Sequence, residues 1–127
     1  MMVDDIAAYL AAGGHGTVGK DIFREKMPET PVLCTVLYAD SGNAPELLGD
    51  VEYPMLQVKT RGESREDAME RINEVLTMLH TLGETTMSGT RYLYIKAASS
   101  MAFAGYDRMT GGAPVYVINF LVTKEIS

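Results

Sequence analysis

Three glycines and a lysine near the N-terminus have the spacing of a phosphate-binding loop. Gly14, Gly16 and Gly19 fit G-x-G-x-x-G, and Gly14 to Lys20 fit G-x-x-x-x-G-K. A dinucleotide-binding loop follows a strand and opens a helix, whereas here a helical pattern precedes the glycines and a strand-like one follows. Asp21 also stands where a P-loop carries the Ser or Thr that binds magnesium, and its carboxylate would repel a triphosphate. The glycines therefore favour a helix end and a flexible loop over a phosphate site.

The chain has two histidines, His15 and His80, and one cysteine, Cys34. A zinc site usually takes three or four ligands with pairs close in sequence, and none of these residues is paired. Cys34 lies in an apolar run, which is typical of a small buried side chain, and a nucleophilic Cys–His pair stays open. His80 lies at a predicted helix end, where a cation suits the helix dipole. We expect no catalytic residue, no cofactor and no metal.

Three glutamates, Glu66, Glu70 and Glu74, recur every four residues and share one face of a predicted helix. A glycosidase carboxylate pair projects from opposite sides of a cleft, which a single helix face does not provide. The three glutamates form either an ordinary solvated face or an acidic surface presented to another molecule.

Hydrophobic spacing predicts the elements that position these residues. An amphipathic helix is predicted over residues 64–82, with Ser64 as its N-cap and Gly83 after its end. A short helix is predicted over residues 3–12, and strands over residues 21–27, 32–39, 53–61, 92–98 and 115–123. The sequence therefore predicts an α+β fold. Its mostly antiparallel or mixed sheet has four to five strands, with an N-terminal helix and one long amphipathic helix packed on one face.

Length and composition predict a single domain over residues 1–127. The chain is 46% hydrophobic, enough for one core, and its single cysteine excludes an internal disulfide. Eleven Lys and Arg against 17 Asp and Glu give a net charge of −6, which argues against a dedicated nucleic-acid binder. The acidic start does not fit a signal peptide, and no apolar run approaches the roughly 20 residues of a membrane-spanning helix. We expect a soluble domain made in the cytoplasm, without a membrane partner.

The last predicted strand is apolar on both faces. Val117 and Leu121 lie on one face, and Tyr116, Ile118 and Phe120 lie on the other. Two helices cover one face of about four strands, and no third helix is predicted. The second face is covered either by a twisted sheet and its loops or by another copy of the chain.

We expect a contact between subunits at Tyr116, Ile118 and Phe120, with Lys59 and Arg61 as charged partners. Lys59 and Arg61 share one face of the strand over residues 53–61. They either pair with acidic groups of a neighbouring subunit or extend their stems along a sheet edge.

Six segments of the chain carry a resemblance to a known family. They are residues 5–10 (DIAAYL), 16–23 (GTVGKDIF), 27–31 (MPETP), 53–62 (YPMLQVKTRG), 89–93 (GTRYL) and the closing strand over residues 116–122. Together they resemble the minor capsid or tail-terminator-like proteins of long-tailed bacteriophages, over nearly the whole chain.

The resemblance implies a structural virion protein that is not an enzyme. Such proteins assemble as a homo-oligomeric ring, commonly hexameric, at the head–tail junction. The ring caps the tail tube, joins it to the neck or connector protein and leaves a channel through which DNA passes. Glu66, Glu70 and Glu74 would then line the channel and repel the phosphates of the DNA. The alternatives are a head-side adaptor of the neck, or a small α+β ligand-binding or enzymatic domain with its cleft at the glycine loop.

Overall fold

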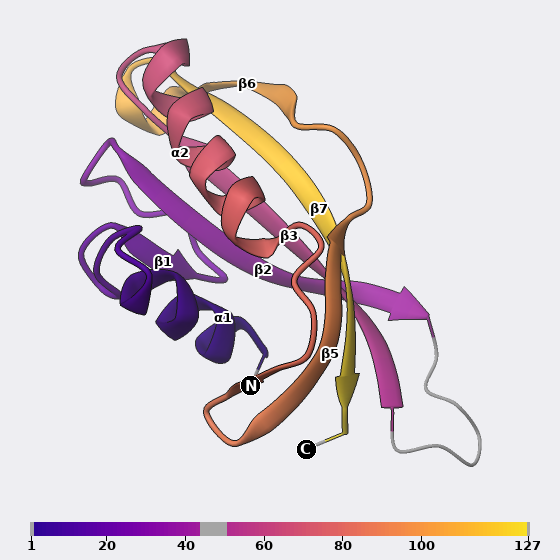
Figure 1. The fold of residues 1–127 in the computed structure, drawn as a ribbon. Coiled ribbons are helices and arrows are strands. Elements are labelled where there is room, and N and C mark those ends of the chain that lie inside the picture. Colours follow the sequence, from indigo (N-terminus) through magenta and orange to yellow (C-terminus); the bar gives the residue numbers. More distant parts are fainter. Residues whose placement is uncertain (1, 44–50, 127) are drawn as a thin grey trace.

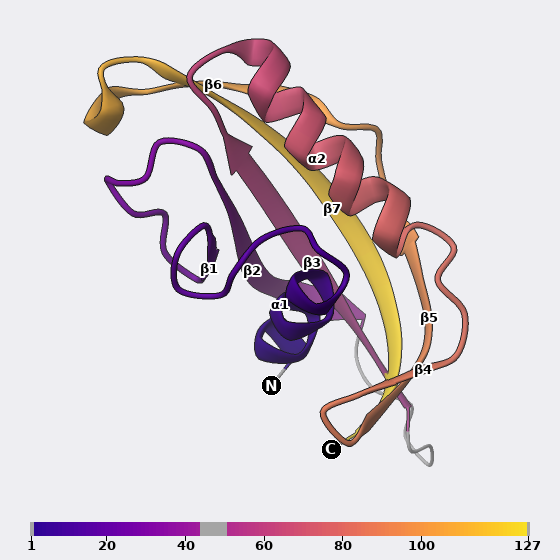
Figure 2. The same cartoon turned by 60° about the vertical axis from the view of Figure 1, so that its left-hand side comes forward.

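The computed structural model describes residues 2–43 and 51–126. Figures 1 and 2 show both helices on the same side of a strongly curved sheet. The elements in chain order are α1 (Met2–Ala12), β1 (Ile22–Arg24), β2 (Cys34–Asn43), β3 (Val51–Arg61), α2 (Arg65–Leu79), β4 (Thr85–Met87), β5 (Thr90–Ala97), β6 (Ala102–Asp107), the 3-10 turn η1 (Arg108–Thr110) and β7 (Ala113–Glu125).

The sheet is organised around β7, its longest strand. The strand order is β1-β2-β3-β7-β5-β4, and β6 also pairs with β7. β1 runs parallel to β2, and the other pairs are antiparallel. On one edge of β7, Ala97 of β5 pairs with Phe120 and Ala102 of β6 pairs with Val117. β5 and β6 therefore lie end to end along β7, like one interrupted strand.

The core lies between the helices and one face of the sheet. Tyr116, Ile118 and Phe120 of β7 point to this face and are at most 6% exposed. Figure 2 shows α2 lying along β7, which its apolar stripe covers. The same core contains Ile6 and Leu10 of α1, Leu56 and Val58 of β3, Ile72, Val75 and Leu79 of α2, and Tyr92 and Ile95 of β5.

Local signals fix the ends of α2. The Ser64 hydroxyl accepts a hydrogen bond from the Asp67 N–H at 3.1 Å, which satisfies one of the free donors at the helix start. The helix ends at Leu79, and the His80 N–H donates to the Leu76 carbonyl. The buried Tyr92 hydroxyl of β5 donates to Asp5 of α1 at 2.7 Å and joins the other helix to the sheet.

The predicted fold class is wrong. The sheet is a curled, mixed sheet of seven strands rather than one of four to five, and the helices have only 11 and 15 residues. Hydrophobic alternation detects strands with one buried face. The side chains of β6 are largely exposed, and pairing with β7 holds this strand in place. The sequence pattern therefore missed β6, and it also missed β4, which has only three residues.

Candidate functional site

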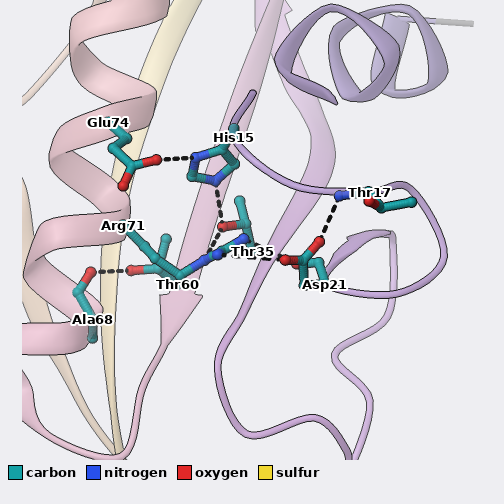
Figure 3. A network of polar contacts seen from close by, with 8 residues as sticks. All are labelled: His15, Thr17, Asp21, Thr35, Thr60, Ala68, Arg71 and Glu74. Atoms are coloured by element: carbon teal, nitrogen blue, oxygen red, sulfur yellow. Dashed lines mark hydrogen bonds and ion pairs between the residues drawn. The ribbon is translucent and has the colours of Figure 1, made fainter. Parts of the chain in front are cut away.

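A buried polar network joins α2 and the glycine loop that follows α1 to the sheet (Figure 3). His15 Nδ1 lies 3.0 Å from Glu74 Oε1 of α2, and His15 Nε2 lies 2.8 Å from Thr35 Oγ1 of β2. Arg71 Nε donates to the same Thr35 oxygen at 2.9 Å. The Glu74 carboxylate only accepts, so His15 Nδ1–H donates to it, and in the neutral imidazole Nε2 then accepts the proton of the Thr35 hydroxyl.

Thr35, His15 and Glu74 have the order of a nucleophile, a base and an acid, but their burial argues against catalysis. Thr35 is fully buried and His15 is 5% exposed, so a substrate has no route to the hydroxyl. Burial and the nearby Arg71 charge lower the pKa of His15, although Glu74 acts in the opposite direction. A neutral, buried imidazole that joins the glycine loop, β2 and α2 serves the fold.

The glycine loop binds a carboxylate supplied by the chain itself. Asp21 Oδ1 accepts a hydrogen bond from the Thr17 N–H at 2.7 Å, and Arg71 lies 3.7 Å from the same carboxyl group (Figure 3). A Cβ atom at Gly16 would collide with this carboxylate. Gly14 has a φ of 90°, which favours glycine. The anion that this loop holds is therefore Asp21.

The structure separates the other two residues considered for nucleophilic or metal chemistry. Cys34 precedes Thr35 in β2, so its side chain points to the opposite face of the sheet from His15. Burial raises the pKa of its thiol. His80 Nδ1 accepts a hydrogen bond from the Ala97 N–H at 3.0 Å. In residues 2–43 and 51–126, no group of three or more His, Cys, Asp or Glu residues is placed to hold a metal ion.

The residues predicted at a subunit contact lie on both faces of the sheet. Tyr116, Ile118 and Phe120 are covered by the chain's own helices, because even-numbered positions of β7 face the core. Lys59 is half-buried on the opposite face, where its ammonium group lies 5.5 Å from the centre of the Tyr38 ring. Lys59 is therefore accessible to a second molecule, whereas the three β7 residues are not.

Arg61 is fully buried within the single chain. Its Nη1 lies 2.7 Å from Asp107 Oδ2 at the end of β6. Its remaining donors bind the backbone carbonyls of Val32 and Pro31, each at 2.9 Å, and of Glu29 at 3.3 Å. Arg61 thus anchors the segment before β2 over one end of the sheet.

The rest of the sheet face opposite the helices is uncovered by any helix of the described chain. We call it the open face. It consists of half-buried or exposed side chains from β2, β3, β5 and β7, namely Tyr38, Met55, Gln57, Lys59, Tyr94, Lys96, Val117, Asn119, Leu121 and Thr123. Within the described residues, the buried Asn119 Oδ1 atom has no hydrogen-bond partner. This face is more apolar than a solvated sheet face requires.

Glu66 and Glu70 lie on the side of α2 that points away from the sheet, and Glu74 lies on the flank of the helix next to His15. Glu66 and Glu70 are exposed, whereas Ala68 and Ile72 face the core. The Glu74 side chain is 50% exposed even though it accepts from His15. We call this surface the acidic face of α2.

The family model for the bacteriophage tail terminator protein matches residues 9–126. This chain belongs to the bacteriophage tail terminator family. The resemblance that the sequence indicated is thereby confirmed. Tail terminators are structural components of the bacteriophage tail, so this tail terminator is a component of the virion. Among the curated proteins, none matches this chain. In the described residues, no helix is long and apolar enough to cross a membrane.

Sequence reasoning missed three residues that organise the tail terminator. Thr35 and Arg71 complete the network around His15, and Asn119 lies within the open face. A polar residue at an inward position of an apolar strand or helix signals a buried partner, because burying it unpaired is costly. That signal was present for Thr35 in the strand and for Arg71 beside the helix's apolar stripe.

Proposed function

We propose that this tail terminator assembles into a closed homo-oligomeric ring of six copies around a channel for DNA. The ring caps the tail tube and joins it to the neck or connector protein. Family membership supports the tail location. The observation that carries the ring is the open face, which no helix within residues 2–43 and 51–126 covers.

The open face has the composition of a protein contact. Met55, Val117 and Leu121 contribute apolar area from its two central strands. These side chains are half-buried, and accessible apolar surface of this kind usually marks an interface, because its burial removes it from water. Asn119 adds an unpaired amide oxygen, which a donor from a second copy satisfies once the amide rotates.

The open face and the helices lie on opposite sides of the sheet. A contact from the open face of one copy to a different surface of the next copy is heterologous. Such contacts generate a ring when the rotation that relates one copy to the next adds up to a full circle. The interface predicted at Tyr116, Ile118, Phe120 and Arg61 needs revision, because these side chains are already buried in the single chain. Lys59 stays in the proposed interface.

The measurement is the particle mass of the purified protein in solution. One chain has a mass of 13.9 kDa, so six copies give about 83 kDa. Leu121→Asp places a charge on the open face and is expected to give folded single chains. Ser99→Asp adds the same charge at an exposed loop position and is expected to keep the ring.

The proposal fails if the wild-type protein stays a single chain at high concentration. It also fails if Leu121→Asp forms particles of unchanged mass. Circular dichroism and thermal unfolding of the Leu121→Asp protein show that its chains are folded, so that lost assembly is not confused with lost fold.

A further inference from the structure

The open face carries cations, and its charges are arranged around β7. Lys59 of β3 pairs with Val117, and Lys96 of β5 pairs with Leu121, so the two lysines lie on either side of the central strand. The two rungs are four residues apart, or about 13 Å along β7. Lys96 is exposed and Lys59 is half-buried. No carboxylate of the described side chains lies between these two rungs on this face.

The acidic face of α2 has the opposite charge. Glu66 and Glu70 are four residues apart, or about 6 Å along the helix. Asn73 and Thr77 are exposed on the same outer side and offer an amide and a hydroxyl donor. These donors are of the kind that the Asn119 amide oxygen lacks.

We propose that the acidic face of α2 of one copy packs across the open face of the next copy, with Glu66 and Glu70 opposite Lys59 and Lys96. This inference rests on the proposed ring and names the two surfaces that form it. Two observations on separate elements agree: the charges are complementary, and the open face contains an unpaired amide oxygen where its proposed neighbour presents donors. Because the two surfaces lie on opposite sides of the sheet, each copy contacts two neighbours, which suits a ring rather than a dimer.

This contact places Glu66 and Glu70 between subunits instead of along the channel. A position between subunits and a position along the channel exclude each other, since a glutamate covered by a neighbouring sheet does not face DNA. Charge reversal distinguishes them. We omit Glu74 from the variants because it accepts from His15, and replacing it would also disturb the fold.

The test uses two double variants and their mixture. Lys59→Glu with Lys96→Glu makes both surfaces of a copy acidic, and Glu66→Lys with Glu70→Lys makes both basic. Each variant alone is expected to be a folded single chain, with ring formation requiring more than about tenfold higher concentration than wild type, because like charges now meet. Mixed in equal amounts, the two variants are expected to form a ring of wild-type mass with alternating copies. The protein with all four substitutions is expected to form the ring by itself.

Matched controls reverse the same charges at exposed positions elsewhere. Lys20→Glu with Lys26→Glu and Glu29→Lys with Glu63→Lys are expected to keep the wild-type particle mass. Raising the salt concentration is expected to weaken the wild-type ring, since exposed ion pairs are screened.

Two results separate the failure of this inference from the failure of the ring itself. If the wild-type protein forms rings and the variant with Glu66→Lys and Glu70→Lys forms equal rings that bind DNA more tightly, the glutamates line the channel and the contact proposed here is refuted. If the two variants each lose the ring but their mixture does not recover it, this contact is also refuted. A wild-type protein that never assembles refutes the ring and the contact together.

Discussion

Replacing Arg61 with Met is expected to destabilise the single chain strongly. The guanidinium is fully buried, and it binds Asp107 and three backbone carbonyls. Removing one partner of a buried ion pair costs about 3–5 kcal/mol. The Asp107 side chain is 17% exposed and regains some water, so we expect a loss near the lower end, about 3 kcal/mol. This is a large part of the roughly 5–15 kcal/mol by which a domain is stable.

Urea unfolding followed by circular dichroism measures this loss. With a slope of about 1.5 kcal/mol per molar urea, the midpoint is expected to fall by about 2 M. All proteins are compared at one protein concentration, because assembly also stabilises the folded state. Lys59→Met is the matched control, two residues earlier in the same strand but on the uncovered part of the open face. It is expected to weaken the ring and to leave the urea midpoint of the single chain nearly unchanged.

The reasoning on Arg61 is refuted by the reverse pattern. If Arg61→Met shifts the midpoint by less than about 0.5 M and still abolishes the ring, then Arg61 acts between subunits, as the sequence suggested. If Lys59→Met lowers the urea midpoint as much as Arg61→Met does, the argument that the buried Arg61 stabilises the single chain and the accessible Lys59 does not is also refuted.

Three further predictions concern single side chains. The pKa of His15 is lowered in the folded state, whereas the unfolded chain binds a proton at this residue near pH 6.5, so the free energy of unfolding should be level above that pH and fall below it. Urea titrations at pH 7.5 and 5.5 check this. If the free energy of unfolding of the His15→Gln protein falls equally between these two pH values, the prediction is contradicted. Phe120→Ala should lower the free energy of unfolding by about 3–5 kcal/mol, because this side chain is fully buried in the core. Leu121→Ala, on the opposite face, should lower it far less and should instead weaken the ring. Urea unfolding measures the first effect and particle mass the second. Ser64→Ala should lower the free energy of unfolding by about 1 kcal/mol, because α2 loses its N-cap. An unchanged melting temperature would refute the capping role.

The positions of the structured elements and their number were predictable to different degrees. The start of α2 was readable because Ser64 and the apolar stripe after it are local signals. The number of strands was not, because β6 gains its place from backbone pairing with β7 and not from a buried face. Its Gly105 and exposed aromatic residues read as a loop when no partner strand is known.

The sequence by itself carried the resemblance to the tail terminator family, and it contains no recognisable catalytic motif. Its excess of acidic residues and the two apolar faces of its last strand are properties of the chain, whatever its fold. Only the tertiary structure decided which of those faces is the core. Alternation separates Phe120 from Leu121 but does not say which of them the helices cover. The same holds for Arg61 and Lys59, because a cation in a strand is buried or free according to the partners that folding brings to it from distant segments.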